Sequence, residues 1–80
     1  MYTVYAISSI SRNYIYVGFT SNLEKQLTRH NRGYEKTTRP YAPFKLIYTK
    51  TGFRSGELAR VHEKYLKSGV GKEFLRSLRS

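Results

Sequence analysis

Apolar and polar residues alternate along three stretches of the chain, residues 2–8, 14–19 and 44–50. Alternation with a period of two among β-branched and aromatic residues predicts a β-strand in each stretch. The predicted faces are Thr3, Tyr5 and Ile7 against Tyr2, Val4 and Ala6; Tyr14 and Tyr16 against Ile15, Val17 and Phe19; and Phe44, Leu46 and Tyr48 together in the third strand. The pattern therefore predicts a sheet of three short strands.

The first two predicted strands are joined by a short polar segment, residues 8–13. A connection of this length favours a β-hairpin, so these strands should pair antiparallel. That pairing can place Tyr5 and Tyr16 on the same face of the sheet. Taken individually, tyrosines in strands are more often packing residues than catalytic ones. Gly18 interrupts the second strand and marks a bulge, a bend or a close approach of another backbone or a ligand.

Residues 21–31 predict a short amphipathic helix directly after the second strand. Ser21, followed three residues later by Glu24, has the form of a capping box, which starts the helix at about Asn22. Helical spacing then places two pairs of side chains on shared faces: the apolar pair Leu23 and Leu27, and the polar pair Gln26 and His30. The helix thus offers an amide and an imidazole beside the strand.

Two further helices are predicted in the C-terminal third of the chain. Ser55 can cap a helix from about Gly56 to Ser68, with Gly69 in the position that ends it. The residues expected to form its apolar stripe are Leu58, Val61, Tyr65 and Leu66. A last short helix over residues 71–78 would pack Phe74, Leu75 and Leu78. Together these elements make a single α+β domain over residues 1–80, with two or three helices around the sheet.

The charge of the chain indicates its partner. Fifteen Lys and Arg residues oppose five Asp and Glu residues, which gives a formal net charge of +10. A field of this size attracts polyanions, so nucleic acid is the expected partner; a basic surface without attached chemistry is the alternative. The basic residues are spread along the chain instead of on one amphipathic helix, which argues against membrane binding. Oligomeric state is left open.

Cysteine content and hydropathy bear on the compartment. The chain has no cysteine, so disulfide bonds and thiolate metal sites are excluded, as suits a reducing cytoplasm. No apolar run approaches the roughly 18 residues of a membrane span, and no signal-peptide pattern opens the chain. We therefore expect a soluble cytoplasmic protein.

The irregular stretch from Asn31 to Pro43 contains two prolines and a glycine. Irregular loops of this length are usually binding loops or disordered. Basic and aromatic residues alternate in it: Arg32, Tyr34, Lys36, Arg39 and Tyr41. This mixture can hold phosphates while offering rings to sugars or bases, so a nucleic-acid contact is expected. An exposed basic loop without a specific role is the alternative.

Several of these segments together resemble a known family. Thr3-Val4-Tyr5, then Tyr16-Val17-Gly18 after ten residues, then a helix ending in His30-Asn31 resembles the GIY-YIG nuclease superfamily. The third strand and the segment from Arg60 to Gly71 also match its small single-domain bacterial members, related to the N-terminal nuclease module of the UvrC repair protein. Thr3 stands where the family usually has glycine. The resemblance covers nearly the whole chain.

The resemblance implies a three-stranded mixed sheet, in the order β-β-α-β-α-α, and a DNA phosphodiesterase site at one sheet edge. By similarity Glu63 would hold one divalent cation, Mg²⁺ or Mn²⁺, as a carboxylate suits that hard ion. Tyr5 or Tyr16 would deprotonate or orient the attacking water, and His30 would bond to a tyrosine or to the leaving group. Without the resemblance, Glu63 would be taken as a surface ion-pair partner contributing less than about 1 kcal/mol.

The chain departs from the family at one catalytic position. The family places an arginine on the first helix ten residues after the second motif's tyrosine, where this chain has Gln26. A neutral amide lacks the charge that stabilises the transition state, and losing such a contact commonly slows a reaction about 100- to 1,000-fold. Arg29 is near in sequence but lies about 300° around the helix. We count Arg29 among the expected nucleic-acid contacts.

Three interpretations follow from this departure. The first is a metal-dependent DNA endonuclease, slowed by Gln26, with a role such as DNA repair. The second is a catalytically silenced domain that binds nucleic acid through its basic loop. The third is a scaffold or RNA-associated module that reuses the fold without hydrolysis. Resemblance alone does not separate them, because function resides in the site.

Overall fold

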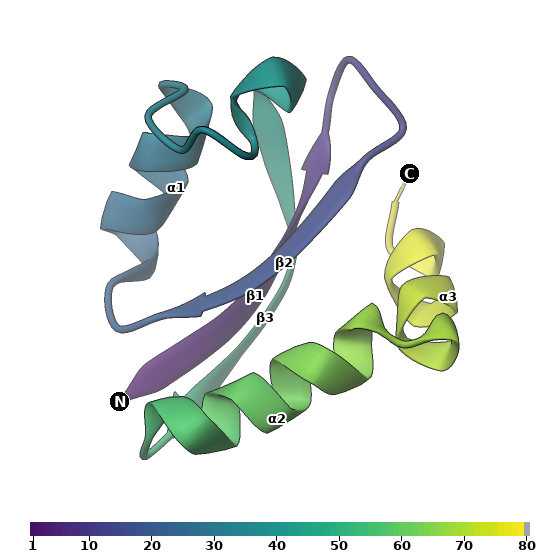
Figure 1. Cartoon of the computed structure of the whole chain (residues 1–80). Helices are drawn as coiled ribbons and strands as arrows, with labels where there is room; N and C mark the ends of the chain where they lie inside the picture. The colour runs from purple at the N-terminus through teal and green to yellow at the C-terminus, as the bar shows by residue number, and fades with distance from the viewer. Residues whose placement is uncertain (80) are drawn as a thin grey trace.

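The computed structural model describes residues 1–79 of the chain. Its elements in chain order are β1 (Tyr2–Ser9), β2 (Ile15–Thr20), α1 (Leu23–Asn31), the 3₁₀ turn η1 (Arg39–Tyr41), β3 (Phe44–Phe53), α2 (Gly56–Lys67) and α3 (Gly69–Ser77). The predicted α+β class and element order are confirmed (Figure 1). Among the described residues, no helix has both the length and the apolar character needed to cross a membrane.

The sheet is antiparallel throughout, which corrects the expectation of a mixed sheet. Its strand order is β2-β1-β3, and β1 pairs antiparallel with both neighbours. The chain forms a hairpin from β1 into β2, passes through α1 and returns to the far side of β1. Consequently β2 and β3 run in the same direction, but β1 lies between them, so no parallel pair forms.

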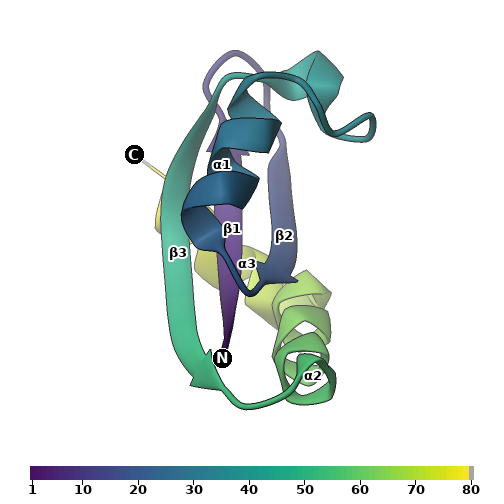
Figure 2. The ribbon, with the colours of Figure 1, turned by 90° about the vertical axis from the view of Figure 1, so that its left-hand side faces the viewer.

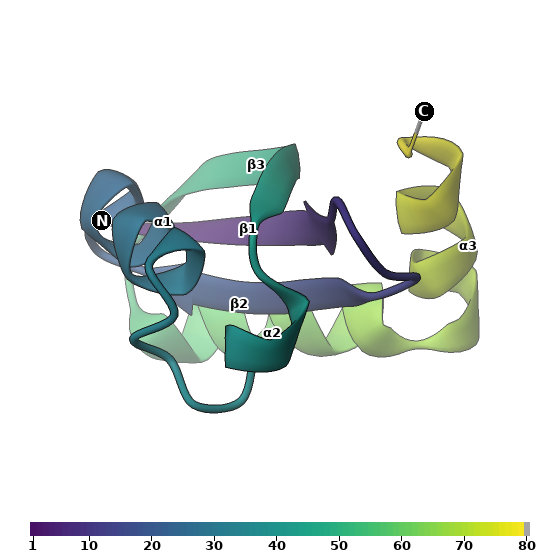
Figure 3. The same cartoon turned by 90° about the horizontal axis from the view of Figure 1, so that it is seen from above.

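Helices cover both faces of the sheet. Helix α1 lies over one face, and α2 and α3 cover the other (Figures 1 and 2). Seen from above, α2 runs alongside β2 (Figure 3). Because β1 is central, it is buried on both faces: Val4 and Ala6 belong to the cluster under α2 and α3, and Tyr5 and Ile7 to the cluster under α1.

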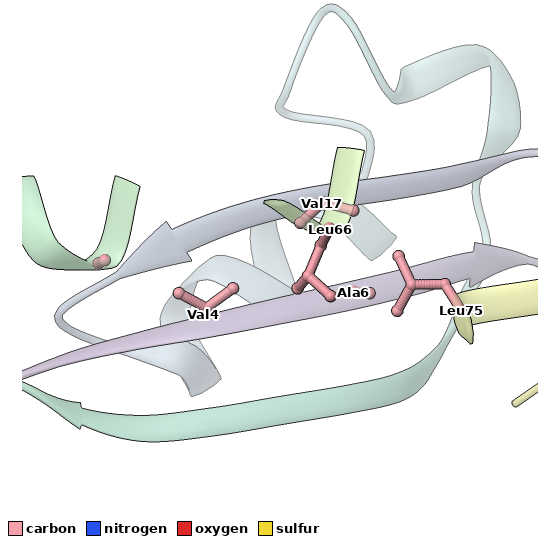
Figure 4. Packing of buried hydrophobic residues seen from close by; sticks show 6 residues of the cluster. Val4, Ala6, Val17, Leu66 and Leu75 are labelled. Carbon is pink, nitrogen blue, oxygen red and sulfur yellow. The ribbon is translucent and has the colours of Figure 1, made fainter. Parts of the chain in front are cut away.

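The cluster under α2 and α3 is the larger part of the core. Its buried members are Val4, Ala6, Val17, Ala59, Leu66 and Leu75, which converge from β1, β2, α2 and α3 (Figure 4). The predicted faces of the first two strands are confirmed, since Ile15 and Phe19 pack on this cluster while Tyr14 and Tyr16 pack on the other.

The predicted face of the third strand is wrong at Tyr48. Ala6 pairs with Tyr48 but Ile7 pairs with Leu46, so one extra residue, Ile47, interrupts the register. An extra residue of this kind switches the faces of the side chains beyond it, here as far as a second register shift between Lys50 and Phe53. Phe44 therefore packs in the cluster under α1, whereas Tyr48 packs in the cluster under α2 and α3. The strand also extends three residues past Lys50, to Phe53.

The predicted apolar stripe of α2 is also wrong, except for Leu66. Leu58, Val61 and Tyr65 are 55%, 69% and 53% exposed, whereas Ala59 and Leu66 are buried. Ala59 and Leu66 are seven residues apart and so share one helix face. The helix packs on the sheet through the small Ala59, and the pattern of large side chains therefore pointed to the wrong face.

Side-chain caps set the helix boundaries. Helix α1 is capped by Asn22, whose side chain accepts from the Lys25 amide, instead of by Ser21. Ser55 caps α2 as predicted, accepting from the amide of Leu58. Ser68 ends α2 and also caps α3, so Gly69 begins α3 where it was expected to end α2. The two C-terminal helices thus meet in a sharp corner.

Gly71 sits at this corner against the backbone of α2. A Cβ atom at Gly71 would lie 2.3 Å from the Tyr65 carbonyl oxygen and 2.5 Å from the Leu66 Cα. Backbone atoms cannot turn aside as a flexible side chain would. Only glycine therefore permits α3 to fold back on α2 at this distance.

Gly71→Ala should lower the free energy of unfolding by about 1–3 kcal/mol, because the added methyl forces the helices apart. Gly69→Ala is the matched control, since a Cβ there meets no atom within 4 Å. Alanine's higher helix propensity should make that control neutral or stabilising by up to about 1 kcal/mol. Urea denaturation followed by circular dichroism measures both. Equal stability of the two variants would contradict the packing at the corner.

Candidate active site

The centre of the candidate site is the pair of strands β1 and β2. Tyr5 lies directly across from Gly18 in the antiparallel register. A Cβ at Gly18 would stand 2.9 Å from the Tyr5 hydroxyl oxygen and 3.0 Å from the Tyr16 ring. The absence of a side chain at Gly18 thus allows the phenols of Tyr5 and Tyr16 to lie close to the backbone of β2. The rings of Tyr5 and Tyr16 lie side by side, with their centroids 6.3 Å apart.

Helix α1 brings His30 onto this pair of phenols. His30 is 1% exposed, and its Nε2 lies 2.8 Å from the Tyr5 hydroxyl oxygen. On the other side of the ring, Nδ1 lies 2.8 Å from the hydroxyl oxygen of Thr38, which is fully buried. Thr38 in turn donates to the carbonyl oxygen of Glu35, at 3.5 Å.

Both ring nitrogens of His30 contact a hydroxyl oxygen, so the direction of each hydrogen bond depends on the imidazole tautomer. With the proton on Nδ1, Thr38 accepts from Nδ1–H and Nε2 accepts the proton of the Tyr5 hydroxyl. With the proton on Nε2, Nε2–H donates to the Tyr5 oxygen and Nδ1 accepts from Thr38. Thr38 was missed from the sequence; the Thr-Thr pair in the loop was the only signal, and nothing in it indicated which threonine would be buried.

Burial keeps both partners neutral. It raises the pKa of Tyr5 well above the ordinary 10, helped by the neighbouring Tyr16, while a hydrogen bond from the Gln26 side chain acts in the opposite direction. Burial also lowers the pKa of His30 below 6.5, which outweighs the raising effect of Glu35. At neutral pH the pair is therefore a neutral phenol hydrogen-bonded to a neutral imidazole.

Glu63 reaches the phenols from α2 on the other side of the sheet edge. Its side chain is only 16% exposed, and it pairs with Lys67 at 3.7 Å. After burial, the Glu63 charge is the largest cause that raises the pKa of Tyr16, and it also raises that of Tyr5. The carboxylate is thus close enough to both phenols for its field to act on them. The ion pair expected for a surface glutamate is present, but Glu63 itself is mostly buried.

The donor set fits a hydrated hard cation. Among residues 1–79 no group of three His, Cys, Asp or Glu side chains could hold a metal ion by itself. Magnesium retains several waters and is commonly bound through one or two carboxylates together with substrate phosphate. A single carboxylate beside a phosphate-binding site, as Glu63 would supply, suits that ion and would not suit zinc.

Gln26 and Arg29 occupy separate surroundings. The Gln26 side chain bonds to Tyr5, so a neutral amide stands where the family has its arginine. The Arg29 Nε lies 3.3 Å from a Glu35 carboxylate oxygen, and its guanidinium lies 6.0 Å from the centre of the Tyr34 ring. Arg29 is therefore paired with Glu35, which leaves its charge compensated.

The remaining predicted nucleic-acid residues lie in the loop after α1. Arg32 and Lys36 are exposed. Arg39 is exposed too, but its Nε donates to the Gly33 carbonyl oxygen at 2.7 Å. The Tyr41 ring is stacked on Tyr14 with centroids 3.8 Å apart, which occupies one of its two faces. The loop folds around buried Thr38 and offers its cations and the exposed Tyr34 ring to solvent.

Comparisons with known proteins identify the family of the chain. Residues 1–75 match the family described as the GIY-YIG catalytic domain. A UPF0213 protein of Clostridium perfringens is 41% identical over 54 residues, covering 66% of this chain and 57% of the relative. The match thus spans just over half the length of that curated relative. No solved structure is significantly similar to the chain. Because the family match extends over nearly all of the sequence, the chain belongs to the GIY-YIG nuclease family.

Proposed function

We propose that this protein is a divalent-metal-dependent DNA endonuclease that hydrolyses phosphodiester bonds at the Tyr5, Tyr16, His30 and Glu63 cluster. The observation that carries the proposal is the 2.8 Å contact between the Tyr5 hydroxyl and Nε2 of His30. A nuclease needs a group that accepts the proton of the attacking water. The Tyr5–His30 pair would supply that group beside the Glu63 carboxylate and the second phenol, Tyr16.

We propose a proton relay from water through Tyr5 to His30. The attacking water gives a proton to the Tyr5 oxygen, while the proton of the Tyr5 hydroxyl passes to His30 Nε2. The transfer uses the tautomer in which Nδ1–H donates to Thr38 and Nε2 is unprotonated. Without this transfer, Tyr5 would be a poor base at neutral pH, because burial raises its pKa. The water oxygen bonds to phosphorus as the bond from phosphorus to the leaving oxygen breaks. Solvent protonates the departing alkoxide, and His30 returns its proton through Tyr5 after the product leaves.

Glu63 would hold one Mg²⁺ or Mn²⁺ ion together with water and a phosphate oxygen. When bound, such an ion neutralises charge that develops on the phosphate. The Glu63 charge raises the pKa of Tyr16, so Tyr16 lies within the field of the proposed metal ligand. Its phenol would orient the water or the phosphate. Because one chain carries one such site, it would cleave one DNA strand at a time.

A silenced binding domain is the second candidate function. The observation that favours it is the neutral Gln26 amide bonded to Tyr5, with Arg29 committed to Glu35. No described cation is shown bonded to the Tyr5–His30 pair. The two candidates share the same nucleic-acid partner and differ only in whether the chemical step occurs.

Glu63→Gln should abolish metal-dependent cleavage while DNA affinity stays within a few-fold, because the amide keeps the shape and loses the charge. Glu57→Gln on the same helix is the control, since Glu57 is exposed in the first turn of α2. Labelled duplex, branched and single-stranded DNA are incubated with Mg²⁺, and calorimetry measures Mn²⁺ binding. Full cleavage by Glu63→Gln would remove the carboxylate from the mechanism.

Gln26→Arg should raise the cleavage rate by up to about 100- to 1,000-fold with little change in DNA affinity, because the added charge acts mainly on the transition state. Single-turnover rates and equilibrium binding separate the two effects. Appearance of activity only in this variant would favour the silenced domain. Equal rates in both proteins would show that Gln26 does not occupy the arginine's role.

Acid should remove both activity and stability through His30. Its pKa lies below 6.5 in the folded protein, so the unfolded chain takes up the proton first as the pH falls, and stability decreases. Protonated His30 cannot accept from Tyr5, so the cleavage rate should fall only below about pH 6.5. His62, whose pKa burial also lowers, is the control. His62→Gln should change the pH dependence of stability but keep the acid limb of the rate; loss of that limb would contradict the assignment.

A further inference from the structure

A second basic feature lies outside the predicted loop. A cleft of about 530 Å³ opens between the outer edge of β2 and helices α2 and α3. In Figures 1 and 3 the first half of β2 and the hairpin before it face α3. The residues that line the cleft and carry charge are Lys67, Lys72, Arg76 and Arg79. Its lining contains no carboxylate, although the neighbouring Glu63 pairs with Lys67.

The cleft continues from the candidate active site. Tyr16 lines the cleft and also contacts His30, with ring centroids 5.0 Å apart. Lys67 lines the cleft and pairs with Glu63 at 3.7 Å. The cleft therefore includes the second phenol, Tyr16, and the lysine that pairs with the proposed metal ligand Glu63.

The form of the cleft suits an extended polyanion. Leu66, Leu75 and Val17 contribute an apolar floor. Lys72 and Arg76 are four residues apart on α3, so they project from one helix face as exposed cations. Strand β2 is the edge of the sheet, so its outer backbone amides are not paired by another strand. Backbone amides and cations are the groups that hold phosphates.

We propose that this cleft binds the phosphodiester backbone of the strand that passes the Tyr5–His30 pair. The inference rests on the proposed function for the identity of the ligand as nucleic acid. Lys67 pairs with Glu63 and Arg79 donates to the Asn13 side chain, whereas Lys72 and Arg76 are exposed cations on α3. This excess of positive charge favours a polyanion over a peptide adding to the edge of β2, which would need none. The cleft thereby extends the binding surface to the side of the site opposite the loop after α1.

The test measures DNA affinity as a function of salt, in EDTA so that cleavage does not interfere. The double variant Lys72→Gln with Arg76→Gln should lower the slope of log K against log salt by about 2, one unit for each lost phosphate contact. The control removes the same charge at Lys50, which lies in the opposite edge strand β3, and at Arg54, which directly follows that strand; neither residue lines this cleft. The control should leave the slope unchanged.

The outcomes separate this inference from the proposed function. An equal change of the salt slope in both double variants, or no change in the cleft variant, would contradict DNA binding in the cleft. Cleavage that depends on Glu63 together with an unchanged slope would keep the nuclease and remove the cleft. A lowered slope in a protein that never cleaves would keep the cleft and remove the nuclease.

A second readout uses the unaltered protein, so it does not depend on how a variant folds. Bound DNA should protect Lys72 from acetylation by several-fold while Lys50 reacts at its free rate, as measured by mass spectrometry. Equal protection of the two lysines would contradict the cleft. An unlabelled peptide of alternating apolar residues should not protect Lys72; protection by that peptide would assign the β2 edge to strand addition instead.

Discussion

The buried hydrogen bond between Tyr5 and His30 is the interaction on which the site depends. A phenol at 1% exposure on the central strand needs a polar partner, since an unpaired buried group costs about 1–3 kcal/mol. His30 supplies it from α1, and Thr38 in turn satisfies the far side of the imidazole. Gly18 leaves room for this arrangement, because an added Cβ would stand 2.9 Å from the Tyr5 hydroxyl oxygen. The position of α1, the order of the loop and the interruption of β2 all follow from one buried pair.

The two faces of the central strand β1 have different roles, since one builds the core and the other carries the candidate site. Alternate residues of β1 point to opposite faces, so Val4 and Ala6 build the core with α2 and α3, whereas Tyr5 and Ile7 face α1. The apolar face gives rigidity, and the polar groups of the other face are held to it through the same backbone. Glu63 is the exception, because it comes from α2 and acts on the phenols past the open edge of β2. Tyr16, on the edge strand β2, and Glu63 thus lie where a long polyanion can approach, whereas Tyr5 and His30 are buried behind them.

Positive charge is distributed unevenly around this cluster. The Tyr5–His30 pair is neutral, and Gln26 adds an uncharged amide to it. The cations lie on either side, in the loop after α1 and along the cleft beside α3. This arrangement favours attraction and orientation of a phosphate backbone more than stabilisation of charge in the transition state. The net charge of +10 does not by itself distinguish binding of a phosphate backbone from stabilisation of charge in the transition state.

The sequence alone determined the elements and the faces of local structure: the two-residue period of the first two strands, the hairpin between them, the Ser55 cap, and the shared helix face of Gln26 and His30. These follow from backbone geometry within a few residues. Tertiary structure alone decided the rest. Burial of Ala59 instead of Leu58, the register shift at Ile47, the antiparallel sheet, the role of Thr38 and the cleft beside α3 each depend on which surfaces meet across the chain. Period and spacing describe which residues share a face, but only packing selects the face that is buried, because that choice is made by distant partners.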